Sequence, residues 1–530
     1  MQTRIWYGRM AGWLLLADGQ RGANCSLANH IMEGWLTLSL IALATLLALW
    51  FFKLSGGKKQ RLPPGPWRLP IIGSLHHVVS VLPHRTMTEL CRRHGPMMYL
   101  QLGEIPTVVV SSAEAVGQMM KASDLLFANR RTTVMQDIVG YGGMGISFAP
   151  YGDHWRRMRK VCATELLSSK QVRRMESVRS EEMGSLLRSM AASPGATVNV
   201  SQKVAALSND VVARAVFGGK FSQQQDYIHA SHRVMNLLGG FSLVDLFPSS
   251  RLVRWLSSEE CRIKSSLDLM QRIITDILVE RKAVRAAGNG DEGLLDVLLT
   301  CQEEDSLESP LTTEMITTVL FDIFGGATDT TSTTFEWAMS ELVNHPVAMA
   351  KAQLEARKVL GPDRAIIVSS DLAELHYMRM VIKETLRLHT PVPLLNRKNG
   401  EDCKIMGHDM LKGTNIYINA FAISRDPQYW NNPEEFIPER FENNNMDYNG
   451  SCFEFTPFGF GRRLCPGITF ASSVLEMALA NFLYHFDWML PDGVISESLD
   501  MSEKFGLIVR RSSDLHLRVI PHLCSKAMEI

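Results

Sequence analysis

The chain has 530 residues, 46% of them hydrophobic, which is enough to bury a large core and excludes a disordered chain or a small disulfide scaffold. Lysine plus arginine and aspartate plus glutamate number 55 each, so the net charge gives no reason to propose a nucleic-acid partner. The nine cysteines form no C-x-x-C pair and do not lie at zinc-like spacing from histidines, a pattern typical of reduced thiols on the cytosolic side of a membrane.

An uninterrupted run of apolar and small residues extends from Trp35 to Phe52, and Lys53, Lys58, Lys59 and Arg61 follow it. A helix of that length just crosses a bilayer. Because the positive charges lie on its C-terminal side, everything after Lys53 is expected in the cytosol. No small-residue cleavage site follows the run, so a membrane anchor is favoured over a cleaved signal peptide or a buried core helix.

The segment Leu62–Pro66 is expected to be stiff and extended, because proline fixes φ and restricts the residue before it. From Trp67 onward no repeat, low-complexity linker or shift in composition divides the chain. We therefore predict four parts: an extension of residues 1–31 that fits poorly in front of an anchor, a transmembrane signal anchor at 32–53, a basic and proline-rich hinge at 54–66, and one folded domain at 67–530.

Two β-rich runs, Met97–Leu102 and Thr107–Val110, flank Gly103–Pro106 and predict a hairpin. Ser111 and Glu114 then have the spacing of a capping box, which predicts that a helix begins there. The longest predicted helix extends from about Thr312 to His345, where Pro346 ends it.

The middle of that long helix, Gly325–Thr331, is composed of weak helix formers. Local violations of this kind are expected at functional sites, although a bland kink in a helix rich in threonine and glycine is the alternative. Further along, Glu384 and Arg387 lie three residues apart on another predicted helix and therefore share a face. Such a pair is ordinarily just a solvated helix pair.

The segment Pro457–Gly467 is glycine-rich and contains Cys465. Arg462 and Arg463 lie beside the cysteine, and an apolar helix is predicted just after it, over Ile468–Leu479. This setting favours thiolate over thiol and suits a metal ligand. The alternative is a buried small hydrophobe, the commoner fate of a free cysteine.

Near the end, Leu507–Val509 and Leu515–Val519 flank the turn Ser512–Asp514 and predict a second small β element. Most of the remaining sequence has helical periodicity. The predicted fold class is therefore mainly α with small β-sheets.

The cysteine segment fits the pattern F-x-x-G-x-R-x-C-x-G through Phe458, Gly461, Arg463, Cys465 and Gly467, and it resembles the haem-binding loop of the cytochrome P450 family. The resemblance implies the P450 fold behind a single membrane anchor, a haem-thiolate catalytic domain at 67–530, and haem b as the cofactor. It also implies that the Cys465 thiolate is the proximal ligand of haem iron and pushes electron density onto it, which favours O–O cleavage.

The middle of the long helix resembles the family's distal oxygen-binding helix. This resemblance implies that Asp329 and Thr330 are an acid–threonine pair. A hydroxyl backed by a carboxylate and water can relay the protons that cleavage of dioxygen needs. Gly326–Ala327 departs from the usual Ala-Gly order without removing the relay. Glu384–Arg387 with Pro438–Phe441 resembles the family's E-x-x-R helix and P-E-R-F loop, which implies a structural triad of Glu384, Arg387 and Arg440.

Trp155 and Arg159 match the family's W-x-x-x-R helix, and this match together with the position of Arg397 implies contacts with haem propionates. The remaining cations, Arg156, Arg157, Lys160 and Arg462, are either solvated charge or a basic surface that docks an acidic electron donor. The segments expected to contact substrate are overwhelmingly apolar, which suits an apolar ligand, although such side chains could equally be ordinary core. They contribute Phe148, Phe321, Phe324, Gly325, Val392, Leu394, Leu395, Phe505 and Leu507.

The resemblance implies a monooxygenase in the endoplasmic reticulum membrane that uses dioxygen and electrons from NADPH through a separate cytochrome P450 reductase, with cytochrome b5 as a further partner. The sequence offers no flavin or nicotinamide site of its own. The anchor, hinge and P-E-R-F motif resemble the plant A-type branch, in particular grass oxidases of labdane-related, pimaradiene-type diterpenes, and Met32 is expected to be the natural start. Oxidation of another terpenoid or of a phenolic or indolic metabolite stays open, as do a reductase-independent isomerase or dehydratase and a non-catalytic haem sensor.

Overall fold

The computed structural model describes residues 35, 37–39, 41–42, 44–45, 60–286, 293–303, 311–444, 446–494 and 498–522. Two compact units divide the chain, Met1–Arg61 and Leu62–Ile530. The predicted extension at 1–31, most of the predicted anchor at 32–53 and residues 54–59 of the hinge lie outside the described residues. Among the residues that are described, no helix combines the length and the apolar character needed to cross a membrane.

The largest sheet has the strand order β1-β2-β7-β4, with bounds Met97–Leu102, Ile105–Val110, Asn415–Asn419 and Leu394–Lys398. The predicted hairpin is confirmed, with β1 antiparallel to β2, although β2 begins at Ile105 rather than Thr107. Successive side chains alternate between the two faces of the sheet and enter different apolar clusters. The smaller sheets are β3-β11-β8 (Thr197–Asn199, His516–Pro521, Phe486–Met489), β5-β6 (Cys403–Ile405, His408–Met410) and β9-β10 (Glu503–Lys504, Arg510–Arg511).

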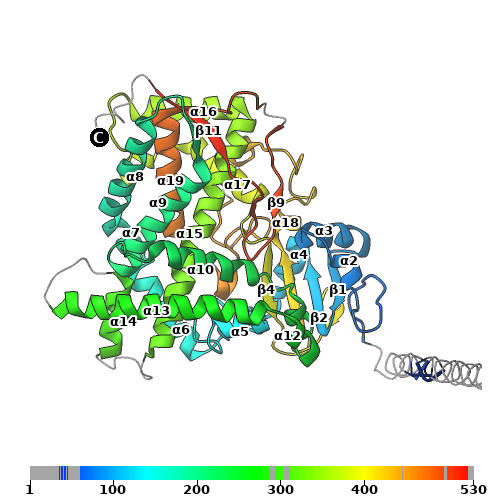
Figure 1. Cartoon of the computed structure of the whole chain (residues 1–530). Helices are drawn as coiled ribbons and strands as arrows, with labels where there is room; N and C mark the ends of the chain where they lie inside the picture. Colours follow the sequence, from blue (N-terminus) through cyan, green and yellow to red (C-terminus); the bar gives the residue numbers. More distant parts are fainter. Residues whose placement is uncertain are drawn as a thin grey trace, which may run out of the picture. The chain divides into compact units, whose positions relative to one another are not determined.

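Helices form the larger part of Leu62–Ile530, as Figure 1 shows, and they contribute most residues of its largest apolar cluster. At the centre α15 (Thr313–Asn344) packs against α9 (Val200–Phe217), α17 (His376–Leu388) and α19 (Ile468–His485). The mainly α fold with small sheets is therefore confirmed. The other described helices are α2 (Leu75–Val78), α3 (Pro83–His94), α4 (Ala113–Ser123), α5 (Val134–Val139), α6 (Asp153–Glu165), α7 (Ser169–Arg174), α8 (Glu176–Ala191), α10 (Gln224–Leu237), α11 (Leu243–Leu246), α12 (Arg251–Leu256), α13 (Glu259–Ala286), α14 (Leu294–Glu303), α16 (Pro346–Leu360) and α18 (Ala420–Ile423), with short 3₁₀ turns at Leu125–Phe127, Ser369–Leu372, Pro438–Phe441 and Gly461–Arg463.

The bounds predicted for the long helix agree with those of α15, which Thr312 caps by accepting a hydrogen bond from the backbone N–H of Met315. The helix is α-helical through its weak middle rather than loosened there. Packing explains the glycine, because a Cβ built at Gly325 would lie 2.3 Å from Cε of Met235 on α10. Close packing against α10 therefore accounts for the glycine at 325.

Two other expectations were wrong in detail. The cap of α4 is Ser112 instead of Ser111, and its hydroxyl accepts from the N–H of Ala115. The second small β element is present in a different form: Leu507–Val509 is not a strand, Arg510–Arg511 pairs with Glu503–Lys504, and β11 enters the three-stranded sheet. The reason is that β11 finds partners in β3 and β8, which are distant in sequence and invisible to a local pattern.

Candidate active site

One cavity brings together the cysteine loop, α15, the start of α6 and the segment before β4. Its wall is formed mainly by apolar side chains. The residues predicted for the site that line it are Phe148, Trp155, Arg159, Phe321, Thr330, Val392, Leu395, Arg397, Phe458, Arg463, Cys465, Gly467 and Leu507. Segments from widely separated parts of the chain therefore meet in one space, as the sequence analysis expected.

Four residues predicted to contact substrate are not among those that line the cavity. Phe324 is buried on another face of α15, where its ring packs against Phe217 and Tyr227. Gly325 lies against α10, Leu394 joins a cluster beside the sheet, and the ring of Phe505 packs against His84 and Phe241. An apolar residue next to the cavity wall can as easily point away from the cavity as into it.

Gly461 and Asp329 are also absent from the cavity wall. Gly461 has φ +62°, and a Cβ there would lie 2.6 Å from Oδ1 of Asp124 and 2.7 Å from Cε of Met120. It is therefore a turn residue that allows a close approach. Asp329 is buried, with its carboxylate bonded to His232 and Arg510 instead of facing the cavity.

The cysteine loop holds Cys465 by backbone contacts immediately before α19. The N–H of Cys465 donates to the carbonyl of Phe458 at 2.9 Å, and the N–H of Gly467 points at Sγ at 3.4 Å. Burial raises the pKa of the Cys465 thiol, while the Gly467 N–H and the charges of Arg159 and Arg130 oppose that rise. A coordinated metal ion would deprotonate such a thiol outright.

Four guanidinium groups gather around the cavity, those of Arg130, Arg159, Arg397 and Arg463. Each donates to backbone carbonyl oxygens, and within the described residues none forms an ion pair with a carboxylate. Burial and the neighbouring positive charges lower the pKa of Arg397 and of Arg463 to about 9. Nε of Arg130 has no hydrogen-bond partner. The cavity therefore contains more basic than acidic groups, and among the described residues its guanidinium groups form no ion pair, although Asp322 lies in the same wall.

Two cavity residues escaped the sequence analysis, Arg130 and Asp322. Arg130 lies in a loop without a periodic pattern. Asp322 has no local signal either, yet its Oδ2 accepts from the N–H groups of Ile146 and Ser147 at 2.7 and 3.0 Å. Burial raises the pKa of Asp322, against the effect of these hydrogen bonds. Asp322 thus holds the segment that supplies Phe148 to the cavity.

The neighbouring polar side chains are engaged locally. The Thr330 hydroxyl donates to the carbonyl of Gly326 at 2.7 Å. Trp155 lines the cavity with its ring, but its Nε1–H donates to the carbonyl of Ile146 at 2.9 Å. Of the cations expected on a basic surface, Arg156 pairs with Asp153 and Arg462 with Asp124. Local carboxylates therefore compensate part of the charge of that surface.

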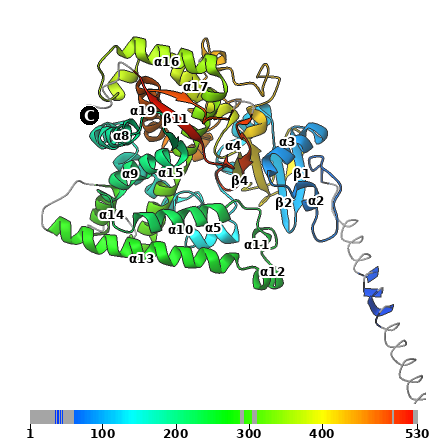
Figure 2. The ribbon, with the colours of Figure 1, turned by 45° about the horizontal axis from the view of Figure 1, so that its top comes forward.

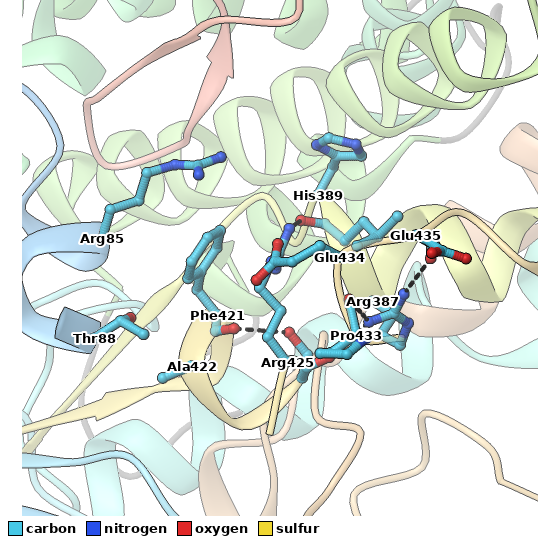
Figure 3. Close-up of polar contacts among 12 residues, drawn as sticks. Arg85, Thr88, Arg387, His389, Phe421, Ala422, Arg425, Pro433, Glu434 and Glu435 are labelled. Atoms are coloured by element: carbon cyan, nitrogen blue, oxygen red, sulfur yellow. Dashed lines mark hydrogen bonds and ion pairs between the residues drawn. The ribbon is translucent and has the colours of Figure 1, made fainter. Parts of the chain in front are cut away.

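The expected triad of Glu384, Arg387 and Arg440 is in contact. Arg387 donates from Nε to Oε2 of Glu384 at 2.7 Å and from Nη2 to Oε1 at 2.8 Å, and Nε of Arg440 donates to Oε1 at 2.9 Å. Arg387 also bonds the carbonyls of Ser424, Pro433 and Glu435, and Figure 3 shows it among these loop residues. The triad therefore ties α17 to the loop that precedes the cysteine segment.

Arg425 forms a second buried junction close by (Figure 3). Its Nε donates to Oε2 of Glu434 at 3.0 Å, its Nη2 donates to the carbonyl of Leu388 at 2.6 Å, and its guanidinium lies over the ring of Phe421. These contacts join the end of α17 to α18. Within the described residues, no cluster of three or more His, Cys, Asp or Glu side chains could hold a metal ion.

Comparisons with known proteins agree with this site. Residues 63–517 match the family described as Cytochrome P450. Desmethyl-deoxy-podophyllotoxin synthase of Sinopodophyllum hexandrum is 44% identical over 487 residues, which cover 91% of this chain and 96% of the relative. Zealexin A1 synthase of Zea mays is 44% identical over 473 residues, 88% of this chain and 94% of the relative.

Ent-cassadiene hydroxylase of Oryza sativa subsp. japonica is 42% identical over 517 residues, 94% of this chain and 99% of the relative. A solved structure of a zebra fish cytochrome P450 with progesterone has a TM-score of 0.72 at 26% identity, covering 84% of this chain and 100% of that one. The family match extends over most of the chain and includes the cysteine loop, α15 and the triad. The chain therefore belongs to the cytochrome P450 family of haem-thiolate monooxygenases.

Proposed function

We propose that this monooxygenase oxidises a labdane-related, pimaradiene-type diterpene in plant specialised metabolism. The observation that carries the proposal is the apolar cavity beside the cysteine loop, lined by Phe148, Phe321, Val392, Leu395 and Leu507. Such a wall suits a hydrocarbon skeleton without polar anchors. The identity with ent-cassadiene hydroxylase, a relative whose name refers to a diterpene, supports the same class.

The test is turnover by membranes that contain the full chain and cytochrome P450 reductase, supplied with NADPH and with ent-cassadiene or a pimaradiene. We expect an oxygenated diterpene that requires both the reductase and NADPH. Products from a sesquiterpene or a phenolic substrate alone would overturn the diterpene assignment and leave the monooxygenase class intact. Product analysis would also identify the carbon attacked and the number of oxidation steps.

The residues present fit a haem. Within the described residues the four guanidinium groups, of which those of Arg397 and Arg463 are buried, form no ion pair with a carboxylate, and the two propionates of a haem are carboxylates that guanidinium groups bind bidentately. We assign Cys465 as the iron ligand, and Arg130, Arg159, Arg397 and Arg463 as the groups that hold the propionates. Haem bound in this way would activate dioxygen, and the reductase would deliver the electrons from NADPH.

In the reaction, the role of the protein is to bind the substrate, exclude water and deliver protons. Thr330 lines the cavity and Asp329 precedes it in the helix, so we assign the pair to proton delivery. Thr330→Ala should fold and bind haem while less product and more hydrogen peroxide form per NADPH consumed. An unchanged ratio in a well-folded variant would remove Thr330 from the mechanism.

We place the enzyme on the endoplasmic reticulum membrane, with a single-pass anchor at 32–53 after the natural start at Met32, a hinge at 54–66 and a cytosolic catalytic domain at 67–530. Two segments meet at the β1–β2 turn, whose backbone N–H groups donate to the carbonyls of Ile72 in one segment and Leu246 in the other. Both segments carry exposed apolar side chains, which supports membrane contact. They are Trp67, Ile71, Val79 and Val81 in one segment and Leu243, Leu252, Trp255 and Leu256 in the other. We assign α6 and Arg462 to the surface that docks reductase and cytochrome b5.

A further inference from the structure

A groove with a volume of about 770 Å³ lies next to the active-site cavity, and Arg130 lines both. Its walls come from the segment 129–134, the end of β4, the loop before β7, and Pro248 between α11 and α12. In Figure 2, α11 lies beside α5 and α12. The groove is therefore formed where several loops meet, and it is distinct from the cavity assigned to haem and substrate.

The charged residues that line this groove are mostly basic. One of them is acidic, the exposed Asp137, and the basic ones are Arg130, Arg131, Lys398 and Lys412. Both lysines are exposed, and within the described residues neither ammonium group forms an ion pair. The carboxylate of Asp402 accepts from the backbone N–H of Lys412 at 2.6 Å instead. The groove thus has an excess of positive charge.

The backbone holds the two lysines in a fixed relation to each other. Asn399, which follows Lys398, is 1% exposed. Its carbonyl accepts from the N–H of Gly413 at 2.8 Å, and its Nδ2 donates to the carbonyl of Leu411 at 3.0 Å. These bonds join the end of β4 to the loop that carries Lys412. The buried asparagine therefore fixes the backbone positions from which both lysines extend.

Arg131 is held on another side of the groove. Its backbone N–H donates to Oδ1 of Asn396 on β4 at 3.2 Å, and its Nη2 donates to the carbonyl of Asp245 on α11 at 2.9 Å. A guanidinium group has five N–H donors, and this bond uses one of them. Arg131 is therefore positioned by the protein while donors of its side chain stay available to a ligand.

We propose that the groove binds a phosphate monoester group through Arg131, Lys398 and Lys412. Such a group carries about two negative charges and three acceptor oxygens near neutral pH, so three separate cations can share it. A carboxylate has one charge and two oxygens, which suit a single guanidinium better. Asp137 offsets one positive charge of the groove and leaves the excess that a phosphate needs.

A membrane lipid is one source of this group, and a soluble phosphate is the other. Pro248 belongs to the segment whose exposed apolar side chains, Leu243, Leu252, Trp255 and Leu256, support membrane contact. A lipid headgroup at that level of the bilayer would lie beside the groove, and basic residues near a membrane surface attract anionic lipids. The lipid source rests on the proposed membrane placement, whereas the phosphate site itself does not.

Acetylation of lysine amines, measured by mass spectrometry on the full chain with haem bound, tests the proposal without turnover. The protein is labelled in detergent with inorganic phosphate or with sodium chloride of equal ionic strength, and in phosphatidylcholine bilayers with or without phosphatidic acid. We expect phosphate or phosphatidic acid to protect Lys398 and Lys412. Lys358, which is exposed on α16, is the internal control and should be labelled equally in all samples.

The variant Lys412→Gln separates a shared ligand from general screening of charge. If one phosphate bridges both lysines, this variant should raise the concentration of inorganic phosphate or phosphatidic acid that protects Lys398 about 5-fold, corresponding to about 1 kcal/mol per cation. Lys358→Gln should leave that concentration unchanged. Haem content and the ferrous–CO spectrum check that each variant is folded.

Protection by phosphatidic acid alone would assign a lipid headgroup, and protection by inorganic phosphate alone would assign a soluble phosphate and remove the groove from the membrane surface. The inference is overturned if neither source protects the two lysines more than Lys358, or if Lys412→Gln leaves the protection of Lys398 unchanged. None of these outcomes depends on the diterpene substrate, which the turnover assay tests separately.

Discussion

Two groups of buried arginines in this molecule differ in what compensates their charge. In the triad, Glu384 and Arg387 are 0% exposed and Arg440 is 11% exposed, and the single carboxylate bonds both guanidinium groups. Around the cavity, Arg130, Arg159, Arg397 and Arg463 bond only carbonyl oxygens. In the triad a carboxylate bonds both guanidinium groups, whereas among the described residues no carboxylate bonds the guanidinium groups of the cavity.

A buried arginine that bonds a carboxylate of the protein stabilises the fold, whereas one without such a partner is suited to bind an anionic ligand. Burying an uncompensated cation is costly, and such a group is retained where a ligand supplies the opposite charge. The lowered pKa values of Arg397 and Arg463, about 9, express that cost. The triad is a structural junction, and the cavity arginines fit the acidic groups of a cofactor.

The largest effect is expected at the centre of the cavity. Cys465→Ala should abolish the thiolate-ligated haem spectrum and all turnover, because none of the other described cysteines lines the cavity. The ferrous–CO spectrum and an NADPH-dependent assay measure this. Cys452→Ala is the control and should keep the spectrum, since its thiol lies near Glu454 outside the cavity wall. A thiolate signature that persists in Cys465→Ala would contradict the assignment.

Removing the charge of the triad's carboxylate should destabilise the fold. Glu384→Gln preserves the shape of the side chain but leaves Arg387 and Arg440 buried without a counter-charge, which should lower the free energy of unfolding by about 3–5 kcal/mol. Urea unfolding of the purified protein measures the loss. The exposed Glu435→Gln serves as the control, with an expected change within about 0.5 kcal/mol. Equal stability of the two variants would show that the triad is dispensable.

Glu341 is another buried acid with basic partners, and the effect of these partners on stability can be followed by changing the pH. Burial alone would raise the pKa of Glu341, but hydrogen bonds from His345 and His389 outweigh it and hold the pKa at about 2. Because this value is below the usual 4.5, the stability from Glu341 is present above pH 4.5 and lost as the pH falls toward 2.

Glu341→Gln should therefore cost about 3 kcal/mol at neutral pH, and the difference from the wild type should shrink as the pH is lowered below 4.5. Unfolding curves recorded across this range measure it. Glu374→Gln, whose carboxylate is exposed, is the control and should show no such convergence. A difference that is constant with pH would mean that ionisation of Glu341 contributes nothing.

The smallest effect is expected at Arg397, and it tests the difference between the cavity arginines and the triad most directly. Arg397→Met removes one uncompensated cation, so the haem-free protein should keep or gain stability, while the holoprotein should release haem roughly 10-fold faster, about 1.4 kcal/mol of lost binding. Thermal unfolding without haem and transfer of haem to an acceptor protein measure the two effects. A loss of stability without haem as large as that of Glu384→Gln would make Arg397 a structural residue like those of the triad.

Local patterns were sufficient where the partners are close in sequence. The first hairpin and both ends of α15 were predicted because turn residues, an N-cap threonine and a proline act within a few positions. The reason for Gly325, the approach of Met235, could not be read from the sequence because it lies on another helix. The orientation of Phe324 could not be read for a related reason: hydrophobicity does not say which way a side chain points.

The sequence by itself determined the family motifs, the cysteine at 465, the E-x-x-R pair and the mainly helical class, because each depends on residue types at short spacing. Only the tertiary structure decided that Arg130 joins the cavity, that Asp322 holds the backbone of Ile146, and that Asp329 is bound by His232 and Arg510. The partners in these last contacts are 176, 97 and 181 positions apart. Charge compensation and burial at such distances are set by packing, which no local pattern encodes.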